Sequence, residues 1–191
     1  MRIVELILDE ENEASGVYAI SLVDRPAIQE NFVLLSKEYE FATIDNERRI
    51  VLGAALVPNK LILRKDVDTG EMYHIYFSEE TIRKTAEKFF KQKLQDQSTL
   101  QHEVAVQGVT AIESWIIEDE KYDKTRKYNL NYPVGTWVVA SKIDNEEVWE
   151  NYVKTGKVLG YSIEGNYKEN VELANVDLEQ EILQFLIDEL K

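Results

Sequence analysis

The sequence predicts an α+β protein built on an antiparallel β-barrel or curled sheet with flanking helices. Six or more short segments are apolar and rich in β-branched residues, a composition typical of strands. Two internal segments instead repeat their apolar residues at the helical period. Turn signals separate the segments: Pro58-Asn59 ends one strand, and Asp66–Gly70 is a turn-rich connection between two others.

Strands dominate the N-terminal half of the prediction. Five segments before residue 78 have strand character, and they are Ile3–Leu8, Val17–Val23, Arg49–Val57, Lys60–Lys65 and Met72–Phe77. Pro26 breaks regular structure after the second segment, where we expect a turn and then a short helix or an extended arm. The last two segments flank Asp66–Gly70 and predict a β-hairpin.

The C-terminal half combines two helices with further strands. Ser78 is a favourable N-cap, and apolar residues from Ile82 to Leu94 follow the helical period, so a helix is expected there. A capping-box pattern at Asp144–Glu147 predicts a second helix, which stops at Gly156. The strands expected in this half are Gln101–Gln107, Val109–Glu118, Thr136–Ile143 and Lys157–Tyr167.

We expect one domain over residues 1–170, with the first ~45 residues forming an arm on the barrel. Residues 171–191 predict an acidic amphipathic helix, because apolar residues from Leu178 to Leu190 share one stripe and acids occupy the other face. This helix has two interpretations. It is either a docking element for a partner or a helix packed on the domain, and its narrow stripe and high charge favour docking.

Composition excludes several functional classes. The net charge of −14 argues against nucleic-acid binding, which needs clustered Lys and Arg. The absence of cysteine rules out disulfides, thiolate catalysis and cysteine-ligated zinc. No apolar run approaches the ~20 residues of a membrane span, and no signal peptide is evident, so we expect a cytoplasmic protein without a membrane partner. No metal or cofactor motif stands out, and none is predicted.

The chain offers two histidines as candidates for a general base. His74 lies in the middle of an aromatic strand and is expected to be structural. His102 begins a strand directly after a polar loop, a common position for functional side chains. The best candidate nucleophile is Ser162 in Gly160–Gly165, where strand alternation places Ser162 and Glu164 on one face. The flanking glycines allow a backbone or a substrate to approach closely, although the spacing differs from the nucleophile elbow of hydrolases.

A hairpin count adds a candidate carboxylate. If Gln107-Gly108 form a two-residue turn, His102 lies opposite Glu113 on one face. A carboxylate there could hold the imidazole tautomer, as the third member of a triad does. A three-residue turn would place His102 opposite Ser114 instead. Glu113 could equally lie on an exposed face of its strand.

The chain resembles the XkdF-like phage serine proteases, a branch of the prohead proteases. The resemblance rests on ordered motifs spread over most of the sequence, and they are Ala19–Ile28 with Asn31-Phe32, Leu52–Lys60, His102-Glu103, Ile112–Ile117, Pro133–Trp137 and Gly160–Gly165. It implies a fold similar to the herpesvirus assemblins, a closed antiparallel barrel with helices around it. Residues 1–170 would then be the protease domain.

The resemblance implies a serine endopeptidase with Ser162 as nucleophile and His102 as general base. Glu113 matches the acidic position of the Glu-Ser-Trp motif and is the favoured third member, with Asp123 in reserve. Gly135 and Gly165 are candidates for supplying the oxyanion hole. The implied substrates and partners are the phage scaffold, the major capsid protein and the enzyme itself, inside a portal-containing procapsid in the bacterial host cytoplasm. The alternative is a catalytically silent capsid, assembly or scaffolding protein that keeps the fold. The oligomeric state, a homodimer or a higher oligomer among the options, stays open.

Overall fold

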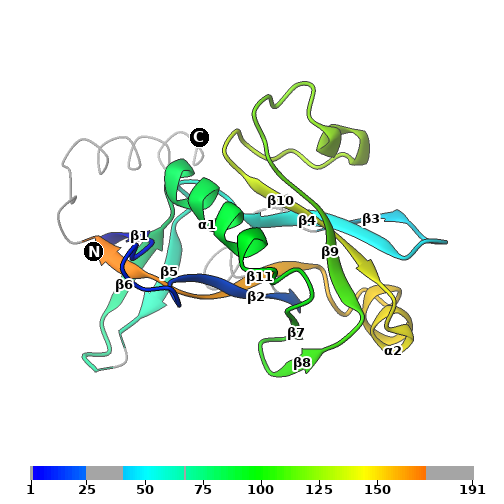
Figure 1. The fold of residues 1–191 in the computed structure, drawn as a ribbon, viewed down its shortest axis with the longest axis horizontal. Helices are drawn as coiled ribbons and strands as arrows, with labels where there is room; N and C mark the ends of the chain where they lie inside the picture. The colour runs from blue at the N-terminus through cyan, green and yellow to red at the C-terminus, as the bar shows by residue number, and fades with distance from the viewer. Residues whose placement is uncertain (1, 25–40, 67, 171–191) are drawn as a thin grey trace.

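The computed structural model describes residues 2–24, 41–66 and 68–170, and its strands form three four-stranded sheets (Figure 1). The α+β class predicted from the sequence is confirmed. A closed barrel is not found among the described strands, because their hydrogen bonds join them into three separate sheets, each with its own edge strands. The arm expected after Pro26 and the expected C-terminal helix lie outside the described residues.

The first sheet contains the predicted hairpin. Its order is β12-β1-β6-β5. These strands are β1 (Ile3–Ile7), β5 (Ile62–Lys65), β6 (Met72–Tyr76) and β12 (Lys168–Asn170). β5 and β6 pair antiparallel with Ile62 opposite Ile75, as the turn at Asp66–Gly70 predicts. The carboxylate of Asp66 accepts the backbone N–H groups of Asp68 and Thr69, which fixes the turn.

The second sheet has central strands that are buried on both faces. Its order is β3-β4-β10-β9. The strands are β3 (Ala42–Asp45), β4 (Ile50–Leu56), β9 (Val109–Ile116) and β10 (Trp137–Ile143). One face packs into the main core, which includes Val51, Trp137 and Val139. The opposite face packs against Leu130 and Tyr132 of the charged 118–133 loop, so β4 reads as a continuous apolar run instead of an alternating one.

The third sheet carries the candidate site. Its order is β11-β2-β7-β8. The strands are β2 (Gly16–Val23), β7 (Ser98–Leu100), β8 (Val104–Val106) and β11 (Gly160–Asn166). Ile20, Leu22 and Tyr161 point into the main core. The alternate residues of β2 and β11, including Ser21 and Ser162, therefore share the opposite face of the sheet.

The helices begin where the sequence predicts. Helix α1 (Glu79–Lys91) has Ser78 as its N-cap, and its Phe89 ring packs edge-on against Trp137 at a centroid distance of 5.5 Å. Figure 1 shows α1 lying across the molecule beside β2 and β10, both of which it contacts. Helix α2 (Glu146–Val148) has Asn145 as its N-cap and continues into one π-helical turn, Trp149–Val153. Within residues 2–24, 41–66 and 68–170, no helix is long and apolar enough to cross a membrane.

The predicted pairing of Gln101–Gln107 with the following strand is wrong. β8 pairs with β7, Ser98 opposite Val106, and β9 pairs with β10 in the second sheet. Two local features explain the difference. Gln101 and His102 both adopt positive φ, which closes a hairpin at residues 101–103 instead of at Gln107-Gly108. Gly108, with φ of 75°, then carries the chain from one sheet to the next, and its carbonyl accepts the N–H groups of Asp144 and Asn145.

Candidate functional site

Ser162 lies in a row of hydroxyl side chains across the third sheet. In the strand register Ser162 of β11 is opposite Ser21 of β2, and Ser21 is opposite Thr99 of β7. Directly paired residues project to the same face, so the three hydroxyl groups are neighbours. Ser21 and Ser162 are buried, with exposures of 0% and 3%.

His102 reaches this row because the chain folds back after β7. Its backbone has φ of 60°, and the preceding Gln101 has φ of 55°. Non-glycine residues rarely adopt this left-handed conformation, and two in succession make a tight reversal. The reversal is anchored to β2, since His102 N–H donates to Ser21 Oγ at 3.0 Å and Gln101 N–H donates to Leu22 O at 2.9 Å.

A carboxylate meets the His102 ring, and it comes from the strand of Ser162. Nδ1 of His102 lies 3.2 Å from Oε1 of Glu164. The hydroxyl of Thr99 donates to the same oxygen. Glu164 is two residues after Ser162, so both side chains leave the same face of β11. The side chain of Glu164 is 18% exposed, which leaves its charge only partly solvated.

The arrangement brings a serine, a histidine and a carboxylate to one face of the sheet, which are the residue types of a catalytic triad. With Nδ1 directed at the carboxylate, Nε2 is the ring nitrogen left for a serine hydroxyl. Among the described residues, no hydrogen bond joins Ser162 to His102; Ser21 stands between them in the sheet. Catalytic hydrogen bonds are often longer in unliganded enzymes than in their substrate complexes.

A family model described as "Putative phage serine protease XkdF" matches residues 38–172. The chain belongs to this family. The match spans β3 to β12 and contains Ser162, His102 and Glu164. No match to the chain is found among curated proteins or among solved structures. The resemblance to the XkdF phage serine proteases stated from the sequence motifs is thus confirmed.

Glu113, the acid predicted from the sequence motif, lies in a different sheet of this XkdF-family chain. Glu113 lies on β9, opposite Ala140 of β10, and it forms an ion pair with Lys124. Its side chain is 45% exposed. The hairpin that was expected to bring Glu113 to His102 is not formed, since β8 pairs with β7.

Asp123, the reserve acid, has a different set of partners. Its carboxylate caps the 3₁₀ turn Lys124–Tyr128 by accepting the N–H and hydroxyl of Thr125. The other carboxylate oxygen accepts Trp115 Nε1–H at 2.9 Å. These contacts hold the 118–133 loop against the second sheet.

Two other serines, and the two glycines considered for the oxyanion hole, have other contacts. Ser114 accepts Trp137 Nε1–H at 2.8 Å, and Ser98 donates to the carbonyl of Val109 at 3.2 Å. The N–H of Gly135 donates to Ile117 O, so it is not free for an oxyanion. Gly165 follows a register shift after Glu164, and a Cβ there would lie 2.8 Å from Gly16 O. This close approach is the reason for glycine at that position.

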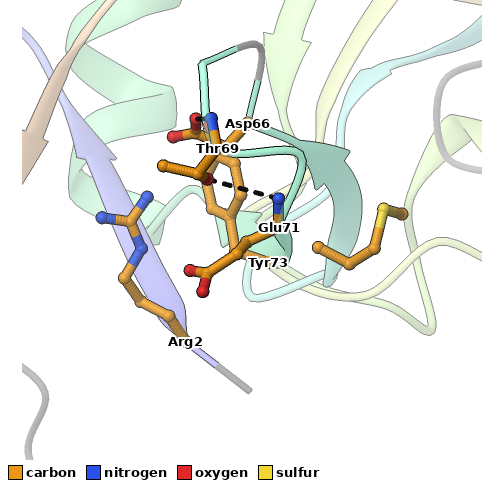
Figure 2. Close-up of a pocket in the computed structure, with 6 residues that line it drawn as sticks. Arg2, Asp66, Thr69, Glu71 and Tyr73 are labelled. Carbon is orange, nitrogen blue, oxygen red and sulfur yellow. Dashed lines mark hydrogen bonds between the residues drawn. The ribbon is translucent and has the colours of Figure 1, made fainter.

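A separate open pocket of about 520 Å³ lies at the β5–β6 hairpin (Figure 2). Arg2 lies over the ring of Tyr73 at 4.6 Å from its centroid, and Glu71 N–H donates to Thr69 Oγ1. Hydrogen bonds from Thr69 lower the pKa of Asp66, so this acid stays ionised. Ser162, His102 and Glu164 are not among its lining residues. In the part of the chain that the structure describes, no group of three or more His, Asp or Glu could hold a metal ion.

The sequence contained part of the signal for Glu164. Strand alternation already placed Glu164 on the face of Ser162. What the sequence could not show is that β7 pairs parallel with β2, and that a left-handed turn then directs His102 back toward β11.

Proposed function

We propose that the chain is a serine endopeptidase with Ser162 as nucleophile, His102 as general base and Glu164 as the carboxylate that orients the base. One observation carries the proposal: His102 Nδ1 lies 3.2 Å from Glu164 Oε1, and Glu164 shares a strand face with Ser162. Membership of the XkdF phage serine protease family supports the reaction class. Glu164 takes the role for which sequence motifs favoured Glu113.

Each residue has a defined part in acyl transfer. Ser162 Oγ attacks the scissile carbonyl while Nε2 of His102 takes its proton. Nε2 then passes that proton to the leaving amine as the C–N bond breaks. Water, deprotonated by Nε2, hydrolyses the acyl ester and regenerates Ser162. Glu164 holds the proton on Nδ1 throughout and stabilises the imidazolium that forms.

The partners and the setting belong to the same proposal. The substrates are the phage scaffold protein, the N-terminal segment of the major capsid protein and the enzyme itself. Cleavage occurs during head maturation inside the procapsid, in the host cytoplasm. The family resemblance also supports a fold related to that of the herpesvirus assemblins. The described strands form three separate sheets and not a closed barrel.

Co-expression with the capsid and scaffold proteins of the same phage tests the function. Wild-type enzyme should shorten both partners, and Ser162→Ala should leave them at full length. Ser114→Ala is the matched control, because it removes a serine hydroxyl of the second sheet, where Ser114 accepts Trp137 Nε1–H, and leaves the third sheet unchanged. Equal processing by wild type and Ser162→Ala would rule out the proposed nucleophile.

A second candidate function has its own supporting observation. Ser162 is 3% exposed and, within the described residues, makes no hydrogen bond to His102, as a catalytically silent assembly or scaffolding protein would allow. In that case procapsids should assemble equally well with wild type and Ser162→Ala, and neither should process the capsid protein. Processing that depends on Ser162 excludes this alternative.

A further inference from the structure

Ser21 occupies the centre of the hydroxyl row. It is opposite Ser162 on one side and opposite Thr99 on the other. Its side chain is fully buried although its face of the sheet is turned away from the main core. Most buried hydroxyl groups have a hydrogen-bond partner, and the partner of Ser21 connects it to the candidate site.

That partner is the backbone of the general base. Ser21 Oγ accepts the N–H of His102 at 3.0 Å. His102 is in the left-handed conformation, which an unrestrained L-residue leaves for a more favourable one. The hydrogen bond from His102 N–H therefore opposes the relaxation that would turn the imidazole away from the sheet.

The other backbone anchors of this turn hold the two neighbours of His102. Glu103 N–H donates to Leu100 O at 3.0 Å. Gln101 N–H donates to Leu22 O at 2.9 Å, and the Gln101 side-chain oxygen accepts Asp24 N–H at 3.2 Å. The ring of His102 is held separately by Glu164. Loss of the Ser21 hydroxyl would leave the chain attached at Gln101 and Glu103 but would remove the hydrogen bond that the N–H of His102 itself makes.

We infer that Ser21 is a positioning residue, which holds the backbone of His102 so that its ring stays against Glu164, on the face of the sheet that carries Ser162. The inference rests on the proposed protease function. Ser21 acts through His102 and does not touch the reacting atoms. Displacement of a catalytic group by about 1 Å costs up to ~100-fold in rate, so the hydroxyl should have a measurable effect on chemistry.

The chain offers a matched control for a buried hydroxyl. Ser98 lies in the same sheet, and its Oγ donates to the carbonyl of Val109 at 3.2 Å. Ser98→Ala removes a buried serine hydrogen bond of similar length without touching His102. Any effect of Ser21→Ala beyond that of Ser98→Ala is therefore specific to the position of the base.

A fluorophosphonate probe measures the reactivity of Ser162 without a peptide substrate. The rate of labelling depends on His102 as base and not on peptide docking. Ser21→Ala should label about 10- to 100-fold more slowly than wild type, and Ser98→Ala within about threefold of it. Ser21→Thr, which keeps the hydroxyl, should restore most of the rate. Ser21→Cys, with a weak acceptor, should be slow and gives a second variant if the alanine variant does not fold.

Hydrogen exchange supplies a readout that does not depend on activity. The amide of His102 should exchange roughly 10-fold or more faster in Ser21→Ala, while the amide of Gln101 keeps its protection. Wild-type labelling at Ser162 combined with unchanged labelling of Ser21→Ala would overturn the positioning role and leave the protease function intact. Absence of labelling in wild type would instead contradict the proposed function itself.

Discussion

Replacement of Glu164 by glutamine tests the carboxylate of the proposed triad. Glutamine keeps the shape of the side chain and an acceptor oxygen for Thr99 and His102 but removes the negative charge. The imidazolium formed in the transition state then loses a charge-assisted hydrogen bond, which contributes about 1.5–3 kcal/mol. At about 1.4 kcal/mol per tenfold change, Glu164→Gln should lower kcat/KM by roughly 10- to 150-fold.

The same substitution at Glu113 provides the comparison. Glu113→Gln breaks the ion pair with Lys124, whose two side chains are 45% and 39% exposed. Exposed pairs contribute about 0–1 kcal/mol, so this variant should fold and cleave like wild type. Cleavage of a capsid-derived substrate, measured at several substrate concentrations, separates the two acids. A wild-type rate for Glu164→Gln together with a large loss for Glu113→Gln would refute the reasoning and restore the acid favoured by the sequence motif.

Three further changes have distinct expected outcomes. Asp123 caps a turn and accepts Trp115 Nε1–H, so Asp123→Ala should lower the free energy of unfolding by about 1–2 kcal/mol in urea titration. The same variant should keep the wild-type kcat, and a large loss of kcat would contradict this structural role. Gly165→Ala should destabilise the fold by about 1–3 kcal/mol in thermal unfolding, since its Cβ would lie 2.8 Å from Gly16 O and 2.9 Å from Tyr167; an unchanged Tm would show that the strands can separate there. Burial lowers the pKa of His74 below its usual 6.5, so the unfolded state binds the proton more readily than the folded state. The contribution of His74 to the free energy of unfolding should therefore be fully present above pH 6.5 and be lost as the pH falls below that value. His74→Gln should flatten that pH dependence in urea titrations, and an identical dependence in the variant would assign it to other groups.

Much of the fold was predictable because it depends on local patterns. The Ser78 cap, the β5–β6 hairpin and the long apolar run of β4 all follow from neighbouring residues. β7 was missed because Ser98–Leu100 is short and mostly polar, and its strand character comes from pairing with β2 and β8. β3 and β12 are similarly short edge strands, whose pairing with β4 and β1 decides their conformation.

The candidate site takes its residue types from the sequence, but its contacts could not be predicted there. The serine and histidine follow from family motifs, and alternation along β11 places Glu164 on the face of Ser162. The contact between His102 and Glu164 depends on two strands that are not consecutive in the sequence and on a left-handed turn without glycine. A non-glycine residue with positive φ has no reliable sequence signal, so the hairpin count chose a wrong partner for this segment.

Mass-spectrometric mapping of the fluorophosphonate adduct tests the central claim most directly, because it identifies the reactive oxygen. The buried neighbour Ser21 makes the measurement informative, since both serines lie in the same row. We predict a single adduct on the peptide that contains Ser162, abolished by Ser162→Ala and strongly reduced by Glu164→Gln. An adduct on Ser21, or labelling that persists in Ser162→Ala, would contradict the assignment of Ser162 as nucleophile.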